Sequence, residues 1–173
     1  YDRTIGTADR TVGLHDFSLR YPVPYRDVLK TQTEQLALDE AWVYGLIRQE
    51  SRFITDARSS AGATGLMQLM PDTARWVARR IGLKNWRWSQ VTEVGTNVGL
   101  GTYYLRHVFD AFDGQPVLAS AAYNAGPSRA RAWRPDTAME GAVFAETIPF
   151  TETRLYVKNV MANATWYAHN FSQ

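Results

Sequence analysis

The clearest helical pattern in the chain lies at residues 39–51, which read DEAWVYGLIRQES. Its apolar side chains recur at the i, i+3 and i+4 spacing that gathers them on one face of an α-helix. The residues on this face are Trp42, Val43, Leu46 and Ile47. The spacing predicts a helix with one buried side.

Glu50 occupies the next position of this apolar face, seven residues after Val43 and three after Ile47. A carboxyl group there loses solvation, unless it is paired or stays protonated with a raised pKa. A carboxyl group with a raised pKa can protonate a poor leaving group, as the cleavage of a glycosidic bond requires. The pattern equally allows Glu50 to turn into solvent at a frayed helix end, or to pair with Arg48 or Arg52. It therefore makes Glu50 a candidate acid and no more.

Helical periodicity continues through the rest of the chain. Four further helices are expected, at residues 71–82, 94–112, 116–123 and 151–168. Pro71 and Gly82 suit the start and the stop of the first of these, and Pro127 can begin another turn. Period-2 segments and internal repeats are absent from the sequence. The sequence therefore predicts an all-α globular domain.

The first 19 residues differ from the rest because they show no sustained apolar period. We expect residues 1–19 to be a connector or the remnant of a preceding domain, and residues 20–173 to form one domain. The chain starts with Tyr1 and has no basic start followed by an apolar stretch, so we expect an excised piece without a signal peptide. No run approaches 18 apolar residues, which predicts no membrane span. A chain of 173 residues buries a core without help, so a monomer is expected.

Composition excludes several classes of function. The chain has 19 basic and 17 acidic residues, a net charge of +2, which is too small to demand nucleic acid as a partner. It has no cysteine, so thiol catalysis, disulfides and thiolate metal sites are excluded. His15, His107 and His169 lie far apart in the sequence, and we expect no metal and no cofactor.

Two loop-like segments carry polar groups beside small residues. Residues 59–71 read SSAGATGLMQLMP, and residues 120–127 read SAAYNAGP. Glycine permits tight turns, and the Gln68 amide both donates and accepts hydrogen bonds. Tyr123 and Asn124 offer an aromatic ring and an amide, a combination that suits sugars. Composition alone favours core packing for Met67 and Met70.

Four motifs occur in a fixed order: RQES at 48–51, GLMQLMP at 65–71, AYNAGP at 122–127 and FAETIPFTETRLYVKNV at 144–160. Together they resemble the catalytic domain of the soluble lytic transglycosylases, over about residues 20–168. That family comprises periplasmic murein-cleaving enzymes with a goose-lysozyme-like fold. The resemblance implies an all-α domain with a substrate groove, a periplasmic location, and a missing N-terminal superhelical region of the same protein.

The resemblance also implies a role for individual residues. Glu50 would be the single catalytic acid and then the base. It would protonate the glycosidic oxygen between N-acetylmuramic acid and N-acetylglucosamine in peptidoglycan glycan strands. It would then take the proton of the C6 hydroxyl as that oxygen bonds to C1, which leaves a 1,6-anhydromuramyl end. Tyr123 would form a hydrogen bond near this carboxylate. The residues implied to contact or enclose substrate are Ser59, Gln68, Met70, Tyr123, Asn124, Glu146 and Tyr156.

Other interpretations stay open at this point. A hydrolase of the goose-lysozyme kind would use a second carboxylate, for which Glu146 is the candidate; Asp56 and Asp72 suit loop or helix-start positions. A non-catalytic glycan-binding module and a helical nucleic-acid binder are further alternatives. Five basic side chains form a patch that is either a solvated helix face or a surface that attracts the carboxylates of murein peptides. They are Arg75, Arg79, Arg80, Lys84 and Arg87.

Overall fold

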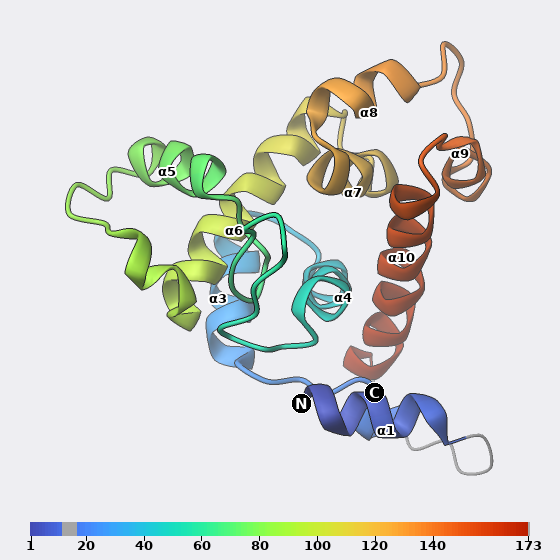
Figure 1. Cartoon of the computed structure of the whole chain (residues 1–173). Helices are drawn as coiled ribbons and strands as arrows, with labels where there is room; N and C mark the ends of the chain where they lie inside the picture. Colours follow the sequence, from blue (N-terminus) through green and yellow to red (C-terminus); the bar gives the residue numbers. More distant parts are fainter. Residues whose placement is uncertain (12–16, 173) are drawn as a thin grey trace.

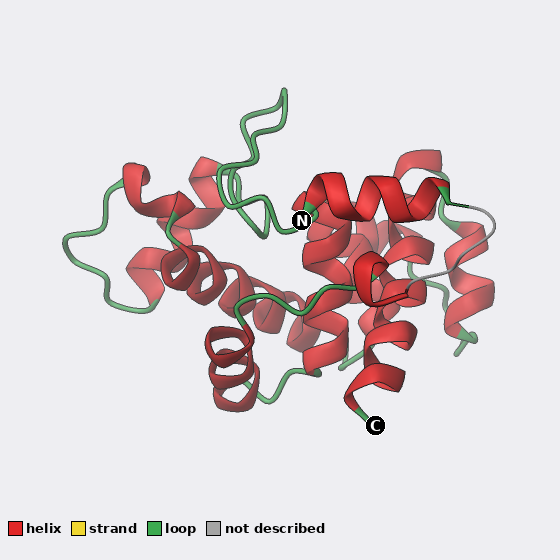
Figure 2. Cartoon of the chain, turned by 90° about the horizontal axis from the view of Figure 1, so that it is seen from below, coloured by secondary structure: helices red, strands yellow, loops and turns green. Residues whose placement is uncertain are grey.

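Every regular element in the part of the chain that the structure describes is a helix (Figure 2). The computed structural model describes residues 1–11 and 17–172. The elements are α1 (Asp2–Arg10), α2 (Phe17–Arg20), α3 (Arg26–Gln35), α4 (Glu40–Ser51), α5 (Pro71–Arg80), the 3-10 helix η1 (Trp88–Thr92), α6 (Val94–Ala111), α7 (Pro116–Ala125), α8 (Pro127–Trp133), α9 (Gly141–Thr147) and α10 (Thr151–Phe171). The predicted all-α class is confirmed.

Helix α4 lies at the centre and packs along α10 (Figure 1). Gly45 makes this contact close: a Cβ atom there would lie 2.7 Å from the backbone nitrogen of Ala164 and 2.8 Å from the carbonyl oxygen of Val160. Asn163 strengthens the contact because its Nδ2 donates to the carbonyl oxygen of Gly45 at 3.3 Å. The two helices therefore hold their side chains in a fixed register.

Both ends of α4 are defined by local interactions. The carboxylate of Asp39 caps the start by accepting from the backbone nitrogen of Trp42 at 2.8 Å. At the other end, Arg52 and Phe53 have φ angles of 48° and 64°, so the helix stops there. The hydroxyl of Ser51 accepts from the backbone nitrogen of Phe53 at 3.2 Å, and the Phe53 ring is buried in the core. Glu50 thus lies in an anchored last turn.

Two apolar clusters form the interior. The larger one gathers side chains of α4, α6, α7 and α10, and the smaller one joins α5 to α6. The smaller cluster consists of Leu69, Ala74, Val77, Ala78 and Leu100. Tyr104 of α6 is half-buried and packs against both clusters. The molecule therefore has two packed parts that meet along α6.

The predicted helices at 39–51, 71–82, 94–112, 116–123 and 151–168 all occur, with ends that shift by up to three residues. Four α-helices were not predicted, namely α1, α2, α3 and α9, and neither was the 3-10 helix η1. α1 is the clearest difference, since no helix was expected in residues 1–19. Its side chain of Ile5 is fully buried, and Asp2 and Asp9 pair with Arg52 and Arg48 of the α4 region. α1 is therefore stabilised by contacts with distant parts of the sequence, and local apolar periodicity gives no sign of such contacts.

Part of the predicted connector, residues 12–16, lies outside the described residues. Whether residues 1–19 belong to a preceding domain stays a prediction. Across the described ranges, no helix combines the length and the apolar character that crossing a bilayer requires.

Candidate active site

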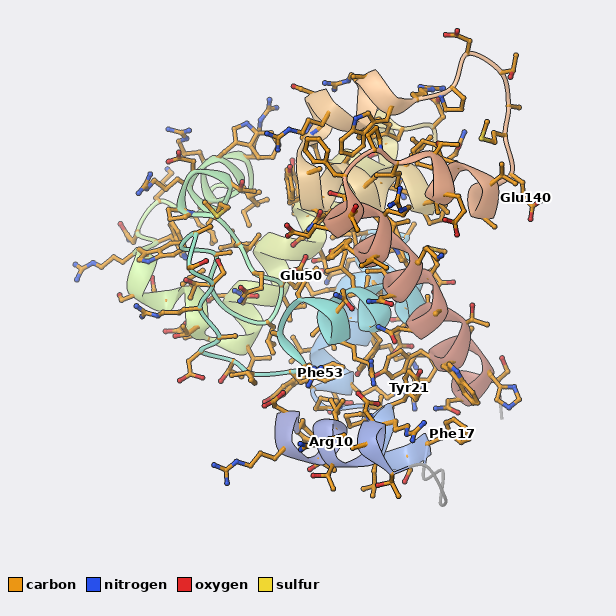
Figure 3. All side chains as sticks on the ribbon, turned by 45° about the vertical axis from the view of Figure 1, so that its right-hand side comes forward. Arg10, Phe17, Tyr21, Glu50, Phe53 and Glu140 are labelled. Atoms are coloured by element: carbon orange, nitrogen blue, oxygen red, sulfur yellow. The ribbon has the colours of Figure 1, made fainter. Side chains whose placement is uncertain are left out.

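Glu50 receives a short hydrogen bond from the partner helix. The hydroxyl of Tyr156, on α10, donates to Glu50 Oε1 at 2.6 Å. The Tyr156 side chain is buried, while Glu50 keeps a partial exposure to solvent. Figure 3 shows Glu50 at the end of α4, between the part of the molecule that carries α5 and the helix α10. This position leaves a buried carboxyl group with access to one side.

Burial raises the pKa of Glu50 to about 7, and the hydrogen bond from Tyr156 opposes that rise. The charged form loses hydration in this apolar setting, whereas the donor favours the carboxylate. The two effects leave a carboxyl group that is close to half protonated at neutral pH. Such a group can both deliver a proton and take one back.

The loop before α5 is folded around the side chain of Gln68. Gln68 has a φ angle of 46°, a conformation that L-residues rarely adopt and that concentrates at functional sites. Its Nε2 donates to the carbonyl oxygens of Ala57 at 3.0 Å and Gly65 at 2.9 Å. The amide oxygen of Gln68 has no hydrogen bond to any described residue, so it is available to a ligand.

Asn97 of α6 fixes this loop from behind. Its Oδ1 accepts from the backbone nitrogen of Met67 at 2.8 Å. Its Nδ2 donates to the carbonyl oxygens of Val91 at 2.7 Å and Thr64 at 3.2 Å. Gly65 makes room for the amide, because a Cβ atom there would lie 2.1 Å from Asn97 Nδ2. Asn97 is fully buried, so these bonds are shielded from water.

Tyr123 of α7 holds the same loop from the other side. Its hydroxyl donates to the carbonyl oxygen of Met67 at 2.8 Å, so both polar groups of the Met67 backbone are fixed by side chains. Burial first, and then the nearby charge of Glu50, raise the pKa of Tyr123. Tyr123 therefore stays a neutral donor and lies close enough to Glu50 to sense its ionisation.

A pocket of about 230 Å³ opens beside these groups. Its lining residues are Gln68, Leu69, Met70, Thr73, Tyr104, Tyr123, Asn124, Ala125 and Gly126. The wall is closed on the α10 side, where the hydroxyl of Thr153 donates to Asn124 Oδ1 at 2.8 Å. Amides, phenol rings and small residues around a cavity fit a hydroxylated ring with one apolar face.

Four of the residues implied by the resemblance line this pocket together: Gln68, Met70, Tyr123 and Asn124. Met67 and Met70 differ in exposure, although composition favoured core packing for both. Met67 is fully buried, as core packing predicted, whereas Met70 is 43% exposed and lines the pocket. Ser59 lies outside the lining, on an exposed turn where its hydroxyl accepts from the backbone nitrogen of Ala63 at 3.0 Å.

The two tyrosines have different hydrogen-bond partners. Tyr123, implied to form a hydrogen bond near the carboxylate, donates to the carbonyl oxygen of Met67, where burial and then the nearby charge of Glu50 raise its pKa. Tyr156 is the residue that donates to Glu50 itself. The close contact of α10 with α4 brings the Tyr156 hydroxyl into reach.

Glu146 lies elsewhere. Its Oε1 accepts from Lys158 Nζ at 2.5 Å on the exposed face of α10, and this bond and charge lower the pKa of Glu146. It lines a separate pocket of about 330 Å³ with Val117 and Met161.

The sequence analysis missed several residues of the site, among them Asn97, Tyr104 and Thr153. A signal for Asn97 was present: it stands at the head of the stripe formed by Leu105 and Val108, as Glu50 does on α4. Thr153 gave no comparable signal. No three His, Asp or Glu side chains in the described ranges group closely enough to hold a metal ion.

Comparison with protein-family models gives two matches. The model described as "Transglycosylase SLT domain" matches residues 27–142, which is more than half of the chain. The model described as "Soluble lytic transglycosylase helical domain" matches residues 147–173.

Two curated relatives share both their name and their degree of similarity. The soluble lytic murein transglycosylase of Salmonella typhimurium is 39% identical over 157 residues, covering 89% of this chain and 24% of the relative. The protein of the same name from Escherichia coli K12 is 37% identical over 153 residues, covering 87% and 24%. The chain thus spans about a quarter of the length of these relatives.

Solved structures agree with this similarity. An inactive mutant of the lytic transglycosylase Slt from Pseudomonas aeruginosa, in which a glutamate is replaced by glutamine, superimposes with a TM-score of 0.93 at 41% identity. The alignment covers 99% of this chain and 28% of that one. The 70-kDa soluble lytic transglycosylase of Escherichia coli superimposes with a TM-score of 0.86 at 36% identity, over 91% of this chain and 26% of that one.

Proposed function

The chain belongs to the Transglycosylase SLT domain family, and from this premise we propose that it cleaves murein as a lytic transglycosylase. Its matched relatives carry that activity in their names. Because the chain spans about a quarter of those relatives, the activity is assigned to the domain present here and is open to direct test.

One arrangement carries the proposal: burial raises the pKa of Glu50 to about 7, and Tyr123, which senses the charge of Glu50, lines a pocket of amides and phenols. A proton donor of this kind is what a glycosidic oxygen needs as it leaves. The relative that superimposes best among those described above is inactive with glutamine in place of a glutamate. That inactivity supports a glutamate as the essential acid.

The reaction then follows in two steps. Protonated Glu50 gives its proton to the oxygen between N-acetylmuramic acid and N-acetylglucosamine, and the C1–O bond of the muramyl residue breaks. The Glu50 carboxylate next takes the proton of the muramyl C6 hydroxyl while that oxygen bonds to C1. The product is a 1,6-anhydromuramyl end, no water is consumed, and Glu50 regains its proton.

Each neighbour of Glu50 has a part in this sequence. Tyr156 stabilises the carboxylate that exists between the two proton transfers, because a donor to the charged form favours it. The free amide oxygen of Gln68 can accept from a substrate hydroxyl or amide. The substrate's own 2-acetamido group would stabilise the cationic C1, so the protein needs no second carboxylate there.

The competing function, hydrolysis by a goose-lysozyme-like enzyme, would use a second carboxylate to activate water. Among the residues that the structure describes, the pocket is lined by no Asp or Glu, and Glu50 lies close to the lining residue Tyr123. Glu146 is bound to Lys158 at another pocket, and Asp56 and Asp72 are exposed. These placements favour the transglycosylase over the hydrolase, and the Glu50 environment disfavours a module that only binds glycan.

The wider setting of the domain is proposed from the same family. We expect it to act on peptidoglycan glycan strands in the periplasm as a monomer. The superhelical region of the relatives would precede it in the same protein. Its action requires no cofactor, since both proton transfers use Glu50.

Mass spectrometry of the products tests the proposal. Purified murein sacculi are digested with this domain and, in parallel, with Glu50→Gln, which keeps the size of the side chain but cannot deliver a proton. Anhydromuropeptides, lighter by one water than hydrolysis products, should appear with the unmutated domain and vanish with the variant. Reducing-end products would instead identify a hydrolase, and a lack of products from the unmutated domain would favour a binding module.

A further inference from the structure

A strongly basic surface lies next to the pocket. Residues 73–92 contain five basic side chains and no acidic one. The chain as a whole has a net charge of only +2, so the remaining residues are net acidic. We call this the cationic surface; its members are Arg75, Arg79, Arg80, Lys84 and Arg87. All five residues are exposed.

Most of these charges are not neutralised by the protein. Arg75 is paired with Asp72 at 2.6 Å. Within residues 1–11 and 17–172, the other four members of the cationic surface form no ion pair. An unpaired group of like charges attracts an anionic partner, and the attraction is strongest at low ionic strength.

An aromatic path joins the pocket to this surface. The rings of Tyr123 and Tyr104, which both line the pocket, lie 5.3 Å apart. Tyr104 is followed by Trp76 of α5, with ring centroids 6.4 Å apart. The guanidinium of Arg80 lies over the Trp76 ring, 5.3 Å from its centroid. A series of ring contacts therefore links the pocket lining to Arg80.

Helix geometry gives the distance from the pocket to Arg80 along α5. Thr73 lines the pocket, and Trp76 and Arg80 follow at i+3 and i+7 on the same side of α5. Seven residues of helix rise about 10 Å. An extended peptide advances about 3.3 Å per residue, so about three residues reach from the pocket to Arg80.

From this arrangement we infer that the cationic surface binds the carboxylates of the peptide stems that branch from the murein sugars. The inference rests on the proposed function, because it assumes a muramyl residue in the pocket. A stem attached to that sugar would run along α5 and place its carboxylates near Arg79 and Arg80. The path supplies apolar contact from Trp76 and charge at its end, which suits a short acidic peptide.

Binding, rather than turnover, tests this assignment. All variants carry Glu50→Gln, so the ligand stays intact. Arg79→Gln with Arg80→Gln removes two unpaired charges of the cationic surface, and the matched control is Arg3→Gln with Arg10→Gln, two exposed arginines of α1. The probes are a murein tetrasaccharide that carries its peptides and the same tetrasaccharide stripped by an amidase. Affinities are measured by calorimetry at about 50 mM and about 500 mM salt.

We expect the α5 variant to bind the peptide-bearing probe about three- to tenfold more weakly at low salt, with a smaller loss at high salt. Its affinity for the stripped probe, and both affinities of the α1 control, should change less than about twofold. These results together would establish stem binding by the cationic surface.

Three results would overturn the inference. They are an equal loss for both probes, no loss for either, and no binding of either probe by the parent Glu50→Gln protein. Vesicles that contain an anionic lipid form a further arm; a loss confined to vesicle binding would assign the surface to a membrane and also overturn the inference. The product analysis of the unmutated domain is independent of these measurements, so a failure of the proposed activity can be told apart from a failure of stem binding.

Discussion

Two glutamates accept hydrogen bonds from side chains that lie two residues apart on α10, and their pKa values shift in opposite directions. Glu50 accepts from Tyr156 on the side of α10 that faces α4, and Glu146 accepts from Lys158 on the exposed side. Two residues correspond to about 200° of turn, which places the partners on opposite faces of the helix. Burial raises the pKa of Glu50, whereas the hydrogen bond and charge of Lys158 lower that of Glu146.

The difference shows that the surroundings, and not the residue type, decide which carboxyl group can do acid chemistry. Lys158 brings a full positive charge in water, so Glu146 stays a carboxylate. Tyr156 brings only a neutral hydroxyl inside the core, which is too weak to offset desolvation. The Glu50 region is thus suited to proton transfer and the Glu146 region to charge pairing at the surface.

The largest expected difference between the two regions is in activity. Glu50→Gln should reduce kcat by about a hundredfold to ten-thousandfold, because the variant cannot transfer a proton. Glu146→Gln should change kcat by less than about twofold, since an exposed ion pair contributes little. Release of anhydromuropeptides from sacculi measures both rates. A large loss in Glu146→Gln would contradict the division of roles and revive a second carboxylate.

The pH dependence of stability should separate the same two residues. The pKa of folded Glu50, about 7, lies above the ordinary value of 4.5, so the stability linked to its proton is complete below about 4.5 and is lost as pH rises through 7. Glu50→Gln should therefore gain stability over the unmutated protein between pH 5 and pH 8, by about 3 kcal/mol at most. Urea unfolding of both proteins at about pH 5 and about pH 8 measures this difference in the free energy of unfolding. Glu146→Gln should show no such gain, and equal behaviour of the two variants would refute a raised pKa.

Removal of either α10 partner provides a finer test. Tyr156→Phe deletes the donor that lowers the pKa of Glu50, so that pKa should rise further and the decline of activity above neutral pH should move to higher pH. We also expect kcat to fall about tenfold, as for the loss of a hydrogen bond to a charged group. Lys158→Gln is the control and should leave the pH–rate profile in place. An unshifted profile in Tyr156→Phe would show that the hydroxyl does not tune Glu50.

Asn97 of α6 fixes the loop that leads to the pocket. Asn163 is a second buried asparagine, which contacts α4 and not this loop, and it serves as the matched control. Asn97→Ala should raise KM about fivefold, since a loss of about 1 kcal/mol in loop positioning has that effect. Asn163→Ala removes bonds to Gly45 and Arg48 and should destabilise the fold with little change in KM. Both variants should lower the urea midpoint, so steady-state kinetics on folded protein is the deciding measurement. If KM rises equally in Asn97→Ala and Asn163→Ala, the role of Asn97 is only to stabilise the fold.

Much of the fold was predictable because apolar periods report which faces are buried. The five predicted helices have stripes long enough to show that period, and each occurs near its predicted bounds. α1 was missed because its mean composition is polar and its burial depends on Ile5 and on ion pairs with α4 residues. Such contacts link positions about 40 or more residues apart, and no local window contains both partners.

Apolar periodicity alone predicts the all-α class, the central helix and the one residue that interrupts its apolar face. The sequence also supplies the order of motifs that indicates the family. The packing of the helices in space determines that Tyr156 is the tyrosine that donates to Glu50. It also determines that Asn97 and Tyr123 bind the two backbone polar groups of Met67, and that Glu146 pairs with Lys158 at a separate pocket. The physical reason is that a helical period reports one side of one helix, whereas a pKa and a hydrogen bond depend on what another helix brings to that side.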